Sequence, residues 1–284
     1  MHVPLPAELA GQRDRLVELI RGYGSCAVAF SGGIDSTVVA KAAALALGEA
    51  AVAVTGASAS LASGELDTAR SLARLIGIRH EVIATAEFAN DRYVRNAPDR
   101  CYHCKTELYT QIGGLCERLG VNVIANGANL DDLGDYRPGM IAAQEHRVVS
   151  PLAECRFDKS AVRALALAWQ LPTWDKPASP CLSSRVAYGQ EVTPDRLAMI
   201  DAAEQLLRGL GLKAVRVRYH AGDVARLEVP LDALVTICQP AVRGDLVKKI
   251  KSLGFKCVTL DLEGFRSGSL NVLENLGSLT PFGH

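Results

Sequence analysis

The sequence predicts an α/β protein with a parallel sheet, followed by a smaller α+β domain. Short apolar runs alternate with helical segments of about a dozen residues through the first half of the chain. Polar turns that contain glycine follow three of these runs, as is typical of the carboxyl ends of parallel strands. After residue 186 the order changes to a long helix, two alternating strands, a helix and a strand. We therefore expect one domain over residues 1–185 and a second over residues 186–284.

The first domain should open with an amphipathic helix over residues 7–22, because Leu9, Leu16 and Ile20 fall on one side of it. Short apolar runs bounded by polar turns predict strands over residues 26–30, 51–55, 80–84 and 121–125, with a shorter one near 148–149. Between them, helical spacing predicts helices over residues 35–47, 65–76, 106–119 and 159–170. Gly77 and Gly120 are the expected stops of two of these helices.

A connector with three prolines, over residues 172–185, leads to the second domain. A long helix over residues 193–210 should follow, with its apolar side, which includes Leu197, Ile200 and Leu210, facing inward. Alternation then predicts two strands, over residues 213–219 and 224–229. A helix over residues 241–253 and a strand over residues 257–260 should complete the domain.

Composition narrows the function classes. The 284 residues are 49% hydrophobic and 22% charged, with a formal net charge of zero, so the chain lacks the basic footprint of a nucleic-acid-binding protein. It contains no apolar stretch long enough to span a bilayer, and its first residues lack the pattern of a signal peptide. We therefore expect a cytoplasmic protein with no membrane or nucleic-acid partner, in which the eight cysteines stay reduced.

The most informative stretch is Ser31-Gly32-Gly33-Ile34-Asp35-Ser36, between the first expected strand and its helix. Two glycines let the backbone approach a ligand closely, and the amides and dipole of a helix N-terminus favour an anion. The turn resembles the pyrophosphate loop of the PP-loop ATP pyrophosphatases, which cleave ATP to AMP and pyrophosphate. An ordinary glycine turn with a helix cap would give a similar pattern.

The fourth expected strand runs into a polar loop, Asn126–Gly139, that carries three aspartates and an arginine. Neighbouring carboxylates repel unless cations neutralise them, and ATP arrives with Mg²⁺. We therefore expect Gly127 and Asp132 to join the turn in an ATP site, with Asp35 or Asp132 holding the magnesium. The alternative is a solvated surface loop.

Three cysteines point to sulfur or metal chemistry. Cys101 and Cys104 stand one helical turn apart near an expected helix N-terminus, and Cys181 lies in the proline-rich connector. The three could bind three irons of a [4Fe–4S] cluster, or the pair could bind zinc with His103. Alternatively, Cys101 and Cys104 are a redox pair or an incidental pair. Four further cysteines have apolar surroundings and should be buried: Cys26, Cys116, Cys238 and Cys257.

In the second domain, Arg216 and Arg218 share one face of an expected strand, about 7 Å apart. Two guanidiniums at this spacing suit a phosphate or carboxylate. On the partner strand we expect Leu227 to point inward, whereas Arg226 and Glu228 point outward. A charged, solvent-facing hairpin explains the pattern equally well.

Five segments in this order resemble the LarE family, ATP-dependent sulfur transferases of nickel-pincer nucleotide biosynthesis: Ser31–Ser36, Arg100–Lys105, Gly127–Gly139, Lys176–Arg185 and Gly264–Asn271. The resemblance implies adenylation of a carboxylate of pyridinium-3,5-biscarboxylate mononucleotide, with release of pyrophosphate, and conversion of that carboxylate to a thiocarboxylate. Some members sacrifice a cysteine, matched here by Cys181, which becomes dehydroalanine. Others hold a [4Fe–4S] cluster whose open iron binds sulfide, and the combination of Cys101, Cys104 and Cys181 resembles that type.

Further roles follow from the resemblance alone. Arg216 and Arg218 would hold the substrate phosphate, and Glu204, Glu228 and Asp232 would be acidic metal contacts. The family also implies a homo-oligomer, expected to be a hexamer.

Other functions remain open from the sequence. A tRNA thiolation enzyme also joins a PP-loop to a Cys-x-x-Cys pair and a later cysteine, although it needs a basic surface. An ammonia-dependent synthetase would leave the cysteines dispensable. A non-catalytic nucleotide sensor would bind ATP without releasing pyrophosphate.

Overall fold

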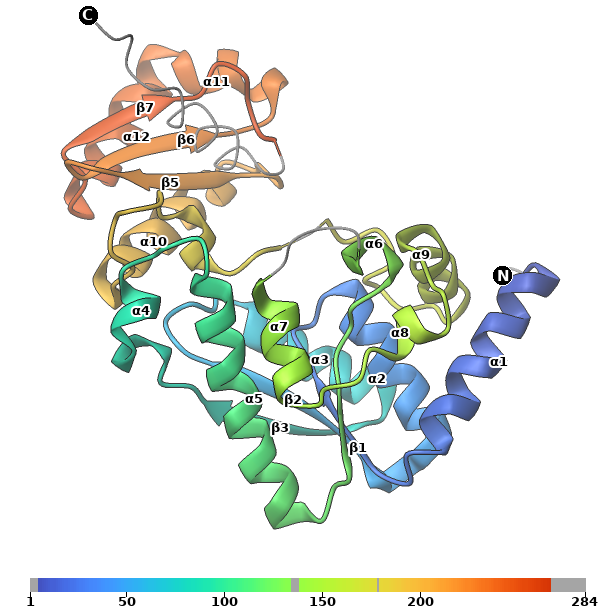
Figure 1. The fold of residues 1–284 in the computed structure, drawn as a ribbon. Helices are drawn as coiled ribbons and strands as arrows, with labels where there is room; N and C mark the ends of the chain where they lie inside the picture. Colours follow the sequence, from blue (N-terminus) through green and yellow to red (C-terminus); the bar gives the residue numbers. More distant parts are fainter. Residues whose placement is uncertain (1–4, 134–137, 178, 267–284) are drawn as a thin grey trace, which may run out of the picture. The chain divides into compact units, whose positions relative to one another are not determined.

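The computed structural model describes residues 5–133, 138–177 and 179–266. The chain forms two compact units, which we describe separately (Figure 1). The first comprises Met1–Asn90 and Asp99–Pro180, and the second comprises Asp91–Pro98 and Cys181–His284. The chain therefore leaves the first unit for eight residues, returns to it, and leaves again at residue 181.

The first unit is built on a parallel sheet, as predicted. Its strands are β1 (Cys26–Ala29), β2 (Ala51–Ala57), β3 (Arg79–Ala84) and β4 (Val123–Ala125). They lie in the order β3-β2-β1-β4, and every pairing is parallel. β1 is central, with Val28 paired to Ala53 on one side and to Ala125 on the other. The carboxyl ends of β1 and β4 therefore meet at one edge of the sheet.

Helices cover both faces of this sheet. Successive strand residues point to opposite sides, and apolar residues on each side belong to a core of their own. Cys26 and Val28 belong to a core with Leu16, Ile20 and Val38, whereas Ala27 belongs to a second core on the other face. The helices of the first unit are α1 (Ala7–Arg21), α2 (Ile34–Leu47), α3 (Glu65–Ile76), α5 (Arg100–Leu119), α6 (Leu130–Leu133), α7 (Pro138–Glu145), α8 (Pro151–Glu154) and α9 (Lys159–Ala168), with 3-10 turns η1 (Gly48–Ala50) and η2 (Glu87–Ala89).

The second unit is the predicted α+β arrangement. Its sheet has the order β5-β6-β7, with β5 (Arg216–His220) antiparallel to β6 (Val224–Glu228) and β6 parallel to β7 (Cys257–Leu260). The other elements of this unit are α4 (Asp91–Val94), η3 (Leu182–Arg185), α10 (Pro194–Gly209), η4 (Leu231–Ala233), α11 (Leu234–Cys238) and α12 (Pro240–Ser252).

Hydrogen bonds hold the segment 91–98 in the second unit. The amide of Val192 donates to the carbonyl of Val94 at 2.8 Å, and Asn96 Nδ2 donates to the carbonyls of Val186 and Ala187 at 3.2 and 2.9 Å. Asn96 is fully buried. These contacts join residues about 90 positions apart, so local sequence patterns did not reveal them.

Several local expectations were wrong. α5 begins at Arg100, six residues before the expected start at residue 106, although Cys101 and Cys104 do lie near a helix N-terminus as expected. Part of the expected polar loop is helical, as α6 and the start of α7. Cys238 and Cys257 are exposed rather than buried, and the side chain of Leu210 is 49% exposed. These three side chains are exposed because they lie at the periphery of the unit. Cys238 ends a short helix, Cys257 lies on an edge strand, and Leu210 follows the end of α10.

Candidate functional site

The turn between β1 and α2 is shaped for an anion. Gly32 has a φ of +69°, a region that favours glycine, and Gly33 precedes the first helical residue, Ile34. Among the described residues no side chain caps α2, so the amides of its first turn are open to a ligand. Ser36 Oγ donates to the carbonyl of Gly33 at 3.1 Å and accepts from the amide of Ser31 at 3.3 Å, which fixes the turn.

The loop after β4 presses against this turn. A Cβ added to Gly127 would lie 2.7 Å from the amide nitrogen of Ser36 and 3.0 Å from the carbonyl carbon of Asp35. Only glycine allows so close an approach without a shift of backbone. Four of the predicted ATP-site residues, Gly33, Asp35, Ser36 and Gly127, therefore lie together.

Asp35 is the centre of a polar network. Its Oδ1 accepts from Asn129 Nδ2 at 3.0 Å, and its Oδ2 accepts from Lys159 Nζ at 2.5 Å. Asp132 Oδ2 accepts from the amide of Asn129 at 3.0 Å, so Asn129 links the two aspartates. These carboxylate and amide oxygens are ligands that Mg²⁺ prefers, and the donor chemistry of the site fits the magnesium of ATP.

A second lysine reaches the turn from the connector. Lys176 Nζ donates to the carbonyl of Gly32 at 3.3 Å and to Glu65 Oε2, on the first residue of α3, at 2.9 Å. Sequence reasoning missed Asn129, Lys159, Lys176 and Glu65 as neighbours of this turn. A lysine beside an aspartate cap or between prolines carries no recognisable signal of such a role.

The carboxyl end of β2 carries a further polar cluster. The hydroxyl of Thr55 donates to the carbonyl of Phe30 at 2.7 Å, so the 2.8 Å contact with His80 requires Nε2 of His80 to be the donor. Burial, and then the charge of Arg70, lowers the pKa of His80, which favours its neutral form. Glu87 is buried and accepts from Ser60 at 3.0 Å.

Cys101 and Cys104 lie on the first turns of α5, where Cys101 is exposed and Cys104 is half-buried. Two thiols at this spacing fit two irons of a cluster. His103, the alternative zinc ligand, is buried, with its Nε2 3.1 Å from Asp99 Oδ2. No group of three or more His, Cys, Asp or Glu side chains that could hold a metal ion occurs within the described ranges.

Three cysteines of the first unit are poor nucleophiles. Burial raises the pKa of Cys26 to about 12, and burial also raises the pKa values of Cys116 and Cys155. All three are therefore thiols at neutral pH. Cys155, whose role the sequence did not indicate, belongs to the core between the sheet and its helices.

In the second unit, Cys181 is exposed but its backbone is fixed. Its carbonyl accepts from the amide of Ser184 at 3.0 Å, from Ser184 Oγ at 2.8 Å and from Arg185 Nη1 at 3.0 Å. Arg185 is itself anchored, because its Nε donates to the buried Glu204 at 3.0 Å. The cysteine therefore stands at the rim of a buried charged cluster.

This arginine cluster contains five arginines and three carboxylates: Arg185, Arg208, Arg216, Arg218, Arg226, Glu204, Glu228 and Asp261. Arg218 binds both oxygens of Glu228, at 3.0 and 3.1 Å. Within the described part of the chain no carboxylate pairs with Arg216, whose guanidinium stacks over Phe265 and donates to the carbonyl of Arg266. Burial, and then the charges of Arg218 and Arg185, lowers the pKa of Arg216.

The expectation that Glu228 points outward was wrong: the residue is fully buried. A carboxylate tolerates burial when guanidiniums compensate its charge, and Arg218 and Arg226 do so here. Glu204 is likewise buried against Arg185 and Arg208, whereas Asp232 is exposed on η4. Glu204 and Glu228 each bind arginines, and the expected metal site of these three acids stays a prediction.

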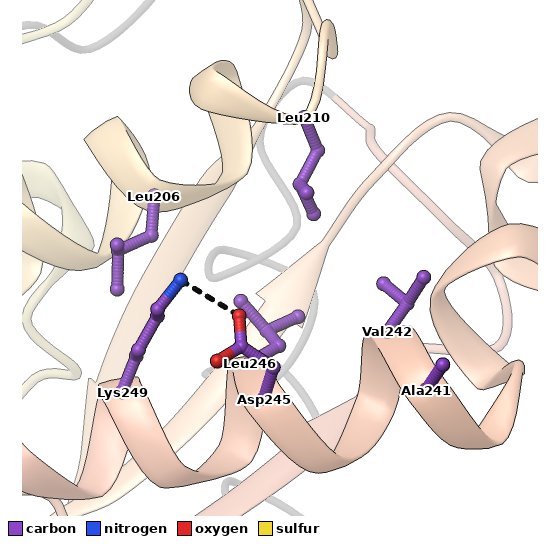
Figure 2. A pocket seen from close by; sticks show the side chains of 7 residues that line it. All are labelled: Leu206, Leu210, Ala241, Val242, Asp245, Leu246 and Lys249. Carbon is purple, nitrogen blue, oxygen red and sulfur yellow. Dashed lines mark ion pairs between the residues drawn. The ribbon is translucent and has the colours of Figure 1, made fainter.

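A surface cavity of about 300 Å³ lies elsewhere in the second unit. Figure 2 shows its lining side chains, which come from α10, α12 and their flanking residues: Leu206, Leu210, Ala241, Val242, Asp245, Leu246 and Lys249. Its polar groups, Asp245 and Lys249, pair with each other at 2.7 Å. It contains none of the predicted site residues.

Similarity to known proteins extends over nearly the whole chain. Residues 17–112 match the asparagine synthase family. The chain is 48% identical over 267 residues to the uncharacterized protein slr1717 of Synechocystis, with 94% of this chain and 98% of the relative covered. It is 40% identical over 267 residues to the pyridinium-3,5-bisthiocarboxylic acid mononucleotide synthase of Lactiplantibacillus plantarum, which covers 93% of this chain and 95% of that enzyme. The uncharacterized protein MJ0830 of Methanocaldococcus jannaschii is 32% identical over 177 residues, 62% of this chain and 68% of its own length. Among the helices described, none is both long and apolar enough to cross a membrane.

Proposed function

The chain belongs to the LarE family of pyridinium-3,5-bisthiocarboxylic acid mononucleotide synthases, and we propose that it is an ATP-dependent sulfur transferase. It uses ATP to adenylate a carboxylate of pyridinium-3,5-biscarboxylate mononucleotide and converts that group to a thiocarboxylate. The observation that carries the proposal is the Ser31–Ser36 turn, with uncapped amides at the start of α2 and Gly127 pressed against it.

The first step is adenylation. The amides of the turn hold the phosphates of ATP, and a carboxylate oxygen of the substrate attacks the α-phosphorus as pyrophosphate leaves. Asp35 and Asp132 are the carboxylates that would hold magnesium, which supplies neutralising charge to the phosphates. The protein contributes chiefly positioning and electrostatic stabilisation.

The second unit supplies a site for the substrate's own phosphate. The arginine cluster has more cations than carboxylates, and Arg216 lacks a carboxylate partner in the described structure. An anion would complete its charge balance. Arg216 and Arg218 are therefore the proposed phosphate ligands, with Glu228 positioning the guanidinium of Arg218 and Phe265 that of Arg216.

The sulfur step uses Cys181. Its thiolate attacks the acyl carbon, AMP leaves, and the Cβ–S bond then breaks with loss of the α proton, which yields a thiocarboxylate and dehydroalanine. Alternatively, Cys101, Cys104 and Cys181 would hold a [4Fe–4S] cluster, which would supply an open iron for exogenous sulfide. Cys101, which is exposed on the first turn of α5, favours the cluster version.

The test combines two measurements on the anaerobically purified protein. Wild type should release pyrophosphate from ATP only when the pyridinium substrate is present, and Cys181→Ala should keep that release but form no thiocarboxylate. Iron and sulfide analysis then separates the sulfur sources: about four irons per chain support the cluster, and a chain lighter by one H₂S after turnover supports the sacrificial route. Thiocarboxylate formation by Cys181→Ala at the normal rate would refute the role of the cysteine.

We further propose a cytoplasmic homo-oligomer that binds neither nucleic acid nor membrane, with a hexamer as the expected state. Support comes from three apolar side chains of the second unit that are 62 to 79% exposed in the single chain, Leu231, Val235 and Leu262. Light scattering on the purified protein measures the assembly, and a monomer at micromolar concentration would refute it.

A further inference from the structure

Two lysines from distant parts of the chain bind the Ser31–Ser36 turn through their ammonium groups. Lys159, the first residue of α9, lies 2.5 Å from Asp35, the fifth residue of the motif. Lys176, from the connector, lies 3.3 Å from the carbonyl of Gly32, the second residue. The two cations therefore approach the turn that is shaped for an anion, each with a carboxylate partner of its own.

Stability alone does not account for this arrangement. The Lys159 and Lys176 side chains are 37% and 23% exposed, and those of Asp35 and Glu65 are 24% exposed. Ion pairs with this access to water typically contribute at most about 1 kcal/mol. Each ammonium carries three N–H donors, so it can keep its carboxylate and still donate to a phosphate.

We propose that Lys159 and Lys176 are ligands of the β- and γ-phosphates of ATP, an inference that rests on the proposed function. Asp35 and Glu65 hold the two ammonium groups at the turn before the nucleotide arrives. When the substrate's carboxylate oxygen bonds to the α-phosphorus, the bond from that phosphorus to the bridging oxygen breaks. Its electron pair leaves with pyrophosphate, and the two lysines neutralise the charge that develops there.

The test is calorimetric titration of the full-length protein with inorganic pyrophosphate and, separately, with AMP. Lys159→Gln and Lys176→Gln should each weaken pyrophosphate binding by roughly tenfold to a hundredfold, the usual range for a lost hydrogen bond between charged groups. AMP lacks the β- and γ-phosphates, so its affinity should not change. Lys159→Arg and Lys176→Arg, which keep the charge, should recover part of the loss. Lys256→Gln is the matched control, because it breaks a 2.7 Å lysine–aspartate pair in the second unit.

Asp35→Asn gives an independent readout that survives if a lysine variant fails to fold. Without magnesium, this change removes a negative charge beside the phosphates, while the asparagine oxygen can still accept from Lys159, so pyrophosphate should bind several-fold more tightly. The proposal is overturned if both glutamine variants bind pyrophosphate as wild type does, or if Asp35→Asn weakens metal-free binding. In either case, substrate-dependent pyrophosphate release by wild type would leave the proposed function standing. Wild type that binds neither ATP nor pyrophosphate would overturn both.

Discussion

Replacement of Gly127 by alanine is the most direct test of the close approach between two strand ends. The new methyl carbon would lie 2.7 Å from the Ser36 nitrogen and 3.0 Å from the Asp35 carbonyl carbon, whereas comfortable contacts are about 3.5–4.0 Å. Both neighbours are backbone atoms, so the loop and the helix start must separate by roughly 0.5–1 Å. Overpacking of this kind costs about 1–3 kcal/mol of stability.

The same shift should damage nucleotide binding more than folding. The methyl group would cover the amide of Ser36, one of the donors at the start of α2, and a lost hydrogen bond to a charged group costs about 1.5–3 kcal/mol. We therefore expect ATP affinity to fall by roughly ten- to a hundredfold. The melting temperature should fall by about 2–12 °C, from the usual scaling for a unit of this size.

Calorimetry with ATP and a thermal melt measure the two effects, and Gly113→Ala provides the control. Gly113 lies within α5, and apart from the nearby backbone of its own helix no described atom lies within 4 Å of an added Cβ. Alanine is the better helix former by about 0.5–1 kcal/mol, so this variant should melt at or above the wild-type temperature and bind ATP normally. If Gly127→Ala matches wild type in both assays, the inference that Gly127 lies too close to the backbone of Asp35 and Ser36 for a side chain is refuted.

Three further predictions concern stability. Glu228→Gln should lower the free energy of unfolding by about 3–5 kcal/mol, because Arg218 loses its buried counter-charge; denaturant titration measures this, and a loss below about 1 kcal/mol would contradict the pairing. The pKa of His80 is lower in the folded state than its unfolded value of about 6.5. Below that pH the unfolded chain binds more protons than the folded chain, so the free energy of unfolding decreases as the pH is lowered. In His80→Gln the melting temperature should decrease less between about pH 7.5 and 5 than in wild type. An unchanged decrease would mean that other groups cause the loss of stability in acid. Asp158→Ala should lower the free energy of unfolding by about 1 kcal/mol, because the carboxylate caps α9 by accepting from the amide of Ala161 at 2.7 Å. An unchanged melting temperature would show that this cap does not stabilise the fold.

The periodicity of the sequence predicted most of the fold. Buried strands such as Cys26–Ala29 have apolar residues on both faces, and their length and glycine borders distinguish them from helices. The strand order follows from pairing rules rather than from composition, so the central position of β1 emerged only in three dimensions. That the carboxyl ends of β1 and β4 lie at the same edge of the sheet was predictable from the parallel arrangement, whereas their adjacency depended on the strand order.

The partners of the charged residues were not predictable. Alternation placed Glu228 on an expected outward face and left the face of Arg218 open between an anion site and solvent, yet both residues are buried and paired across the hairpin. Period-two patterns separate apolar from polar positions, and a buried ion pair has the same pattern as a solvated one. Lys159 reaches Asp35 across 124 residues of sequence, and no local rule connects the two.

The excursion of residues 91–98 has a practical consequence for dissecting the enzyme. A C-terminal truncation at Pro180 would retain this octapeptide while removing the carbonyls that Asn96 binds, so a segment that is packed in the intact chain would be left exposed to water. Separate expression of either half is therefore a poor route to its properties. After limited proteolysis at the 180/181 junction, no covalent bond would join the two fragments, and the hydrogen bonds of residues 91–98 with Val186, Ala187 and Val192 would link them.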